Sequence, residues 1–108
     1  MATTTTLTPL LTDGAALDSD LIEKSCTVLG LLSNPARLRL AVAMYRHPNS
    51  TVTQLAEDVD LSPDRVSALL RPMRHARLVS YVVTGRSANY RITDELARSI
   101  VVTCLATR

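Results

Sequence analysis

The chain has 108 residues, of which 46% are apolar, with a formal net charge of +2 and three tyrosines as its only aromatic side chains. This length fits one domain with a core of Leu, Val, Ile and Ala, and chains this small often gain stability by pairing with a copy of themselves. No apolar run approaches the roughly 20 residues of a membrane span, and the start, MATTTTLTPLL, lacks the basic segment of a secretory signal, so we expect a cytoplasmic protein.

The N-terminal stretch differs in composition from the rest. Residues 1–16 are rich in threonine and contain Pro9 and Gly14, so we expect a flexible arm ahead of a single domain over residues 17–108. The first helix is expected to begin at Asp18 or Ser19. Its apolar side is broad and consists of Leu21, Ile22, Cys26, Val28, Leu29 and Leu32.

A second helix is predicted from SNPARLRLAVAMYRH. Asn34 stands where a helix N-cap is preferred, and Pro35 follows at the first helical position, where proline is tolerated. We expect Leu38, Val42 and Tyr45 to form the inner stripe of this helix, which ends at His47-Pro48-Asn49.

Two short amphipathic helices follow, separated only by Asp60 and Leu61. In the second of them Ser62 is the expected cap and Pro63 the first residue. Two such helices joined by a tight turn form a helix-turn-helix. Apolar residues recur at i, i+3, i+4 and i+7 in both helices, at Val52, Leu55, Ala56 and Val59 and at Val66, Leu69, Leu70 and Met73.

A hairpin and a last helix complete the chain. LVSYVVTGRSANYRI, residues 78–92, alternates apolar and polar side chains around Gly85 and Arg86, which predicts two strands and a tight turn. A lone hairpin is marginal in water, so it must pack on the helices. TDELARSIVVTCLATR predicts a terminal helix capped by Thr93. This order predicts a mainly α protein with a small β-hairpin, a winged helix-turn-helix whose hairpin is the wing.

Basic side chains concentrate in the second half of the chain. Residues 61–91 contain six arginines and one aspartate, whereas residues 1–30 contain four acidic side chains and one lysine. Arginine binds phosphate and guanine in a bidentate fork, and small side chains let a helix enter the major groove. An ordinary solvated surface, with Arg86 as a solubilising charge, is the alternative. The predicted DNA-binding residues are Thr53, Gln54, Ser62, Pro63, Asp64, Arg65, Ser67, Ala68, Arg71, Arg74, His75 and Arg86.

Three stretches resemble the ArsR/SmtB family of bacterial metal-responsive repressors. LLSNPARLRLA (31–41), LAEDVDLSPDRVSALLRPMRHARLV (55–79) and TGRSANYRI (84–92) are similar to the family's second-helix, helix-turn-helix and wing signatures. The resemblance implies a homodimer formed through the first and last helices. It also implies that the dimer represses a promoter by binding a palindromic operator on double-stranded DNA, with recognition helices about 34 Å apart, until an inducer arrives.

The chain differs from the family at the positions that bind the inducing metal ion in other members. Members that sense soft metals carry Cys-x-Cys where this chain has Thr51 and Thr53, whose hydroxyls bind thiophilic ions poorly. Members that sense zinc use an Asp-x-His pair and a distal histidine. Here Asp94 is retained, but Leu96 and Thr107 occupy the histidine positions.

Three backbone details also differ from the family. Asp60 and Arg77 stand where the family has glycine, and both are expected in the left-handed region, which aspartate tolerates better than arginine. Pro72 lies inside the predicted recognition helix, and we expect a kink there because proline removes a backbone donor.

The candidate sensor residues are Cys26, Cys104, His47, His75, Asp94 and Glu95. The two cysteines are either buried small hydrophobic residues or a redox switch at the dimer interface. The histidines and carboxylates are candidates for a nickel, zinc or cobalt site between subunits. Alternatively, His47 caps its helix and His75 contacts phosphate.

We therefore predict a sequence-specific DNA-binding regulator, a repressor by resemblance, that responds to a metal ion or a redox signal. An enzyme is not expected, because no nucleophile, base and orienting residue stand together and no glycine-rich phosphate loop occurs. Two alternatives stay open. One is a winged-helix regulator without its own sensor that acts with a regulatory partner protein, and the other is a protein-interaction module that has lost DNA binding.

Overall fold

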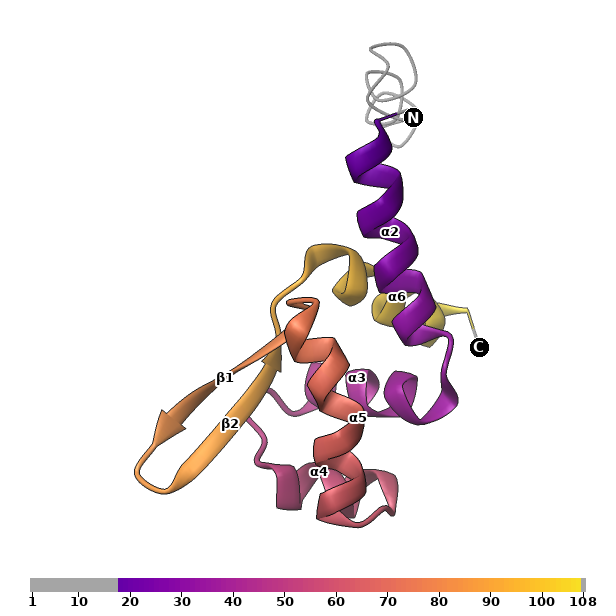
Figure 1. The fold of residues 1–108 in the computed structure, drawn as a ribbon. Helices are drawn as coiled ribbons and strands as arrows, with labels where there is room; N and C mark the ends of the chain where they lie inside the picture. Colours follow the sequence, from indigo (N-terminus) through magenta and orange to yellow (C-terminus); the bar gives the residue numbers. More distant parts are fainter. Residues whose placement is uncertain (1–17, 108) are drawn as a thin grey trace.

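The computed structural model of the protein describes residues 18–107. The predicted order of helices and strands, and with it the winged helix-turn-helix, is confirmed (Figure 1). The N-terminal arm predicted over residues 1–16 lies outside the described residues. No helix in residues 18–107 is long and apolar enough to cross a membrane. The elements are α2 (Ser19–Leu32), α3 (Pro35–Arg46), α4 (Val52–Val59), α5 (Pro63–His75), β1 (Val79–Thr84), β2 (Ser87–Ile92) and α6 (Glu95–Ala106).

The predicted helix starts are confirmed for α2, α3 and α5. Asp18 accepts a hydrogen bond from the backbone N–H of Asp20 at 2.8 Å. Asn34 and Ser62 cap α3 and α5 in the same way, each followed by a proline. These side chains satisfy backbone donors that have no partner inside the helix.

The cap of α6 lies one residue later than predicted. Asp94, not Thr93, accepts the hydrogen bond from the backbone N–H of Ala97, at 2.9 Å. The Thr93 hydroxyl instead donates to the Arg77 carbonyl at 3.3 Å. Thr93 and Asp94 are adjacent, and both residue types are common N-caps. Because the Thr93 hydroxyl bonds to the residue that follows α5, Asp94 caps α6 instead.

α4 and α5 are both followed by a residue in the left-handed region, as predicted. Asp60 has φ 58° and Arg77 has φ 63°. After α5 the Leu78 N–H donates to the Met73 carbonyl at 2.9 Å, and the Arg77 N–H donates to the Arg74 carbonyl at 3.0 Å. These two bonds form a Schellman motif, which satisfies the last carbonyls of the helix.

α5 itself continues through Pro72 to His75, so the proline does not end the helix. The kink stays a prediction. All four residues expected on the inner side of α5 are buried, namely Val66, Leu69, Leu70 and Met73.

The inner stripe predicted for α3 is wrong. The buried residues are Leu40, Ala41, Ala43 and Met44, whereas Tyr45 is 39% exposed. The physical reason is that α3 is the central helix and packs against α2, α4, α5, α6 and β2. A helix covered on several sides has apolar residues around most of its circumference, so spacing alone does not identify its core face.

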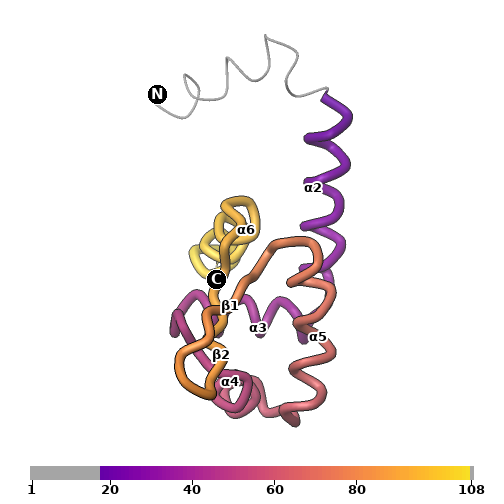
Figure 2. Tube along the Cα trace, turned by 60° about the vertical axis from the view of Figure 1, so that its left-hand side comes forward, coloured from indigo at the N-terminus to yellow at the C-terminus, as the bar shows by residue number. Residues whose placement is uncertain are grey.

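The broad apolar side of α2 is divided between the core and the surface. Val28 and Leu32 are buried, whereas Leu21, Ile22 and Leu29 are 44%, 49% and 52% exposed. Figure 2 shows the N-terminal part of α2 extending away from the other helices. Apolar side chains on this part of the helix, such as Leu21 and Ile22, are therefore only partly covered by the rest of the described chain.

The wing is attached to the helices at its base. Val79 pairs with Ile92, Tyr81 with Tyr90 and Thr84 with Ser87, which leaves a two-residue turn of Gly85, with φ 62°, and Arg86. A bridge between Ser50 and Tyr90 links β2 to the segment before α4. The base of the hairpin is therefore fixed to the helix-turn-helix, while its far end extends beyond the helices (Figure 1).

Candidate nucleic-acid interface

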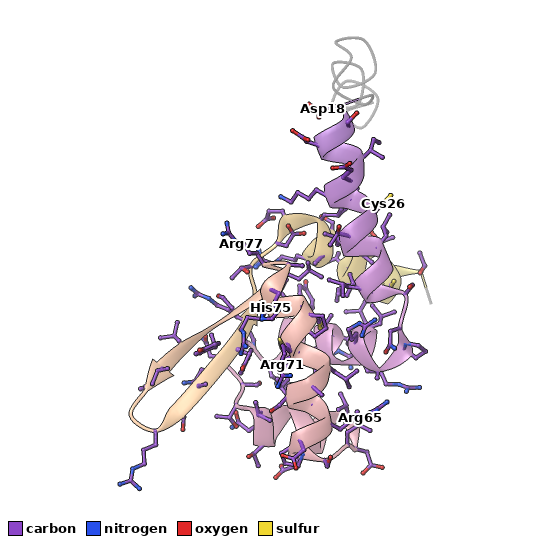
Figure 3. All side chains as sticks on the ribbon, viewed as in Figure 1. Asp18, Cys26, Arg65, Arg71, His75 and Arg77 are labelled. Atoms are coloured by element: carbon purple, nitrogen blue, oxygen red, sulfur yellow. The ribbon has the colours of Figure 1, made fainter. Side chains whose placement is uncertain are left out.

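One side of α5 is open to solvent along its whole length. Arg71 and His75 lie on this side, and Arg65 lies on its flank near the start of the helix (Figure 3). Ser67 and Ala68, between Arg65 and Arg71 in the chain, are also exposed, so the middle of this side carries only small side chains. A helix of this shape fits the major groove, because small side chains permit close approach and the arginines supply hydrogen-bond donors.

The arginines of this side have no acidic partners. Over residues 18–107 the ion pairs are Lys24 with Asp94, at 3.7 Å, and Arg98 with Glu95, at 3.0 Å. Neither includes an arginine of α5 or of the wing. Internal ion pairs at these positions would have left no free positive charge for a polyanion, so this result agrees with the predicted DNA-binding surface.

Arg74 occupies a distinct environment on the flank of α5. Its guanidinium carbon lies 5.6 Å from the ring centroid of Tyr81 in β1. The Tyr81 ring in turn lies 5.2 Å from that of Tyr90, its partner in β2. Tyr81 was not among the predicted site residues. The sequence carried no signal for this contact, because it joins a helix to a strand and no spacing within either element pairs the two side chains.

The residues predicted to bind DNA at the helix starts also form capping hydrogen bonds. Thr53 and Gln54 are exposed on α4, and the Gln54 side-chain oxygen accepts a hydrogen bond from the Thr51 N–H at 2.9 Å. Ser62 accepts the Arg65 N–H at 3.2 Å. Both side chains therefore keep a donor group free while they cap their helices.

The other predicted DNA contacts are exposed as well. Pro63 and Asp64 lie in the first turn of α5, and Arg86 lies at the turn of the wing. The structure thus gathers the predicted residues on three elements, α4, α5 and the wing.

The two cysteines are exposed in the single chain, and their predicted burial at a dimer interface stays a prediction. Cys26 lies on α2 and Cys104 on α6. Their burial was expected because both helices have broad apolar sides, but parts of these sides face outward. Leu29 on α2 and Val102 on α6 are exposed in the same way.

The metal-ligand candidates lie at the ends of different helices, apart from the adjacent pair Asp94 and Glu95 at the start of α6. In residues 18–107 no three His, Cys, Asp or Glu side chains form a group that could hold a metal ion. Asp94 caps α6, and Glu95 pairs with Arg98. His47 follows α3, and its backbone N–H donates to the Ala43 carbonyl at 2.8 Å. His75 is exposed in the last turn of α5.

Leu38 and Val42, which were expected in the core, are half-buried and line a groove of about 710 Å³ between α3 and the end of α4. Arg39 and Arg46 line it from α3, and two aspartates line it from the end of α4. The walls thus carry both signs of charge, and the groove does not select one class of ligand.

No family model matches the sequence. The chain is 35% identical over 75 residues to a transcriptional repressor SmtB homolog of Synechocystis sp.. This match covers 69% of the chain and 56% of the relative, so the chain spans little more than half of that protein's length.

Solved structures give a similar result. The AntR antimony-specific transcriptional repressor has a TM-score of 0.75 and 28% identity, covering 82% of this chain and 80% of that one. The transcriptional repressor PagR of Bacillus anthracis has a TM-score of 0.75 and 23% identity, covering 81% and 99%. A homodimeric winged helix-turn-helix DNA-binding domain of Mycobacterium bovis has a TM-score of 0.71 and 22% identity, covering 82% of each chain. By their names, the repressors among these proteins are regulators of transcription and not enzymes.

Proposed function

This chain is an ArsR/SmtB-like winged helix-turn-helix protein, and from that premise we propose that it is a DNA-binding transcriptional repressor that acts as a homodimer. The observation that carries the proposal is the set of exposed arginines on α5 and the wing, none of which has an acidic partner among residues 18–107. A protein-interaction module would have no need for this concentration of free positive charge on one side.

In this proposal α5 lies in the major groove. Arg71 and Arg65 reach base edges and phosphates, while Ser67 and Ala68 allow close approach of the helix. Arg86 at the wing turn contacts the backbone or the adjacent minor groove. Thr53 and the capping residues of α5 contact phosphates at the edge of the groove.

The exposed apolar residues of α2 and α6 support pairing of two chains. Leu21, Ile22 and Leu29 on α2 and Val102 on α6 are each more than 40% exposed. Apolar surface of this kind on terminal helices is commonly covered by a partner. A two-fold axis through this pair would place two copies of α5 about 34 Å apart, one turn of DNA.

A salt titration of DNA binding tests the proposal. Duplexes selected from a random pool are used in a gel-shift assay between 50 and 200 mM salt. With about six phosphate contacts per dimer, affinity is expected to fall by roughly 10³-fold over this range. Arg86→Gln removes two contacts per dimer and should reduce the salt slope by about 2. Weak binding that does not depend on salt would support the interaction module instead.

The matched control is Arg39→Gln. Arg39 is an exposed arginine on α3 that lines the groove and is not in an ion pair within the described chain. It lies outside the proposed DNA surface, so its loss removes the same charge without removing a contact. Equal effects of Arg39→Gln and Arg86→Gln would mean that only net charge matters.

We further propose that an oxidant or a divalent ion releases the DNA. Cys26 on α2 and Cys104 on α6 support the first, because both thiols lie on the helices proposed to pair, where their oxidation would change the interface. For the second, a nickel, zinc or cobalt site would need His47, His75, Asp94 or Glu95 from two chains. DNA binding is measured with each ion and with a mild oxidant, using Cys26→Ser and Cys104→Ser as controls. If none of them releases the DNA, regulation by a separate partner protein is the better proposal.

A further inference from the structure

We infer that Tyr81 is a positioning residue that holds the Arg74 guanidinium ready for a DNA phosphate at the junction of α5 and the wing. The inference rests on the proposed function. It adds Tyr81, an uncharged residue that acts on DNA binding through Arg74.

The contact between the two side chains leaves the guanidinium of Arg74 without a hydrogen-bond partner in the described chain. Its carbon lies 5.6 Å from the Tyr81 ring centroid. In the described chain the Arg74 side chain forms no ion pair and donates no hydrogen bond to another residue. The five N–H donors of a guanidinium lie in its plane. A cation held against an aromatic ring therefore keeps these donors available, while the ring restricts its rotation.

The ring that holds Arg74 is itself fixed. Tyr81 lies against Tyr90 with centroids 5.2 Å apart and a tilt of 40°. Tyr90 is only 7% exposed, and its backbone carbonyl accepts from the Asn49 N–H at 3.1 Å while its own N–H donates to the Ser50 carbonyl at 2.8 Å. The support for Arg74 therefore extends through the wing to the segment that begins α4.

The ligand class follows from the geometry of arginine. A planar fork with free donors matches two oxygens of a phosphate in a bidentate pair. Arg74 stands in the last turn of α5, beside the first strand of the wing. In the proposed complex, a phosphate bound by Arg74 belongs to the DNA backbone that separates the major groove, occupied by α5, from the minor groove beside the wing. Arg71, by contrast, is exposed and has no aromatic partner in the described chain, so its side chain is free to adapt to a base.

A double-mutant cycle tests the inference on the homodimer and a selected duplex at fixed salt. Tyr81→Leu is expected to weaken binding by about 4- to 25-fold, since each dimer has two contacts and each is worth roughly two- to five-fold. In the Arg74→Ala background the same change should have no effect. Tyr81→Phe keeps the ring and should bind like the unmodified protein. A purely structural role of Tyr81 would lower affinity equally in both backgrounds.

A second variant, at Arg74 itself, separates the effect of guanidinium geometry from the effect of positive charge and leaves the wing unaltered. Arg74→Lys retains the positive charge but loses the planar fork, so the salt slope should stay the same while affinity falls. The inference is overturned if Tyr81→Leu has the same effect with and without Arg74, or no effect in either case. Absence of salt-dependent DNA binding by the unmodified protein would instead remove the proposed function itself.

Discussion

Arg77→Gly should make the protein more stable, although it removes a charged side chain and adds flexibility. Arg77 has φ 63°, a conformation in which a side chain is strained. This strain costs about 1–2 kcal/mol for an ordinary L-residue. Glycine avoids it but loses about 0.5–1 kcal/mol more backbone entropy on folding. The difference predicts a net gain of about 1 kcal/mol in the free energy of unfolding.

The structure shows that little else is lost by this change. The Arg77 side chain is exposed and is in no ion pair over residues 18–107. The main-chain N–H that bonds to Arg74 and the carbonyl that accepts the Thr93 hydroxyl remain in glycine. The Schellman motif is therefore kept, and only the strained side chain is removed.

Thermal unfolding measures the effect, at one protomer concentration because a dimer's melting temperature depends on it. A gain of 1 kcal/mol corresponds to about 4–8 °C in a domain of this size. Arg77→Ala is the control, since it removes the charge but keeps the Cβ atom. If alanine stabilises the protein as much as glycine does, charge and not backbone strain is responsible. If glycine lowers the melting temperature, the reasoning is wrong.

Three further changes test other features. Asp94→Ala removes the cap of α6 and the partner of Lys24, and should lower the free energy of unfolding by about 1 kcal/mol in urea titrations; Thr93→Ala, next to it, should cost less. Leu70→Ala truncates a side chain that is 1% exposed and should cost about 2–5 kcal/mol, whereas a cost below 1 kcal/mol would contradict the described core. Leu29→Asp alters a residue that is 52% exposed and should convert dimers to folded monomers in sedimentation experiments; dimers that persist would exclude α2 from the interface.

The sequence predicted best those features that depend on near neighbours in the chain. The caps at Asn34 and Ser62 and the buried side of α5 are examples, because a cap and an apolar stripe are each specified within a few residues. The left-handed residues at Asp60 and Arg77 belong to the same class. These local features were sufficient to predict the winged helix-turn-helix.

Features that depend on distant contacts were missed or placed wrongly. The core side of α3 is determined by five other elements, so its own periodicity did not identify it. Thr93 is diverted by a carbonyl 16 residues earlier. The contact between Arg74 and Tyr81 joins a helix to a strand, and no spacing within either element predicts it. The cysteines are exposed in the single chain, and apolar spacing does not reveal whether a covering neighbour belongs to the same chain.

The paired main-chain bonds between Tyr90 and residues 49–50 have a mechanical consequence. They join the base of the hairpin to the start of α4, so we expect the wing and the helix-turn-helix of one protomer to move together as one unit. A signal that leaves these bonds intact cannot tune the hairpin and the recognition helix separately. It must act on the distance or angle between two such units, and small movements at the interface would then be amplified at their far ends.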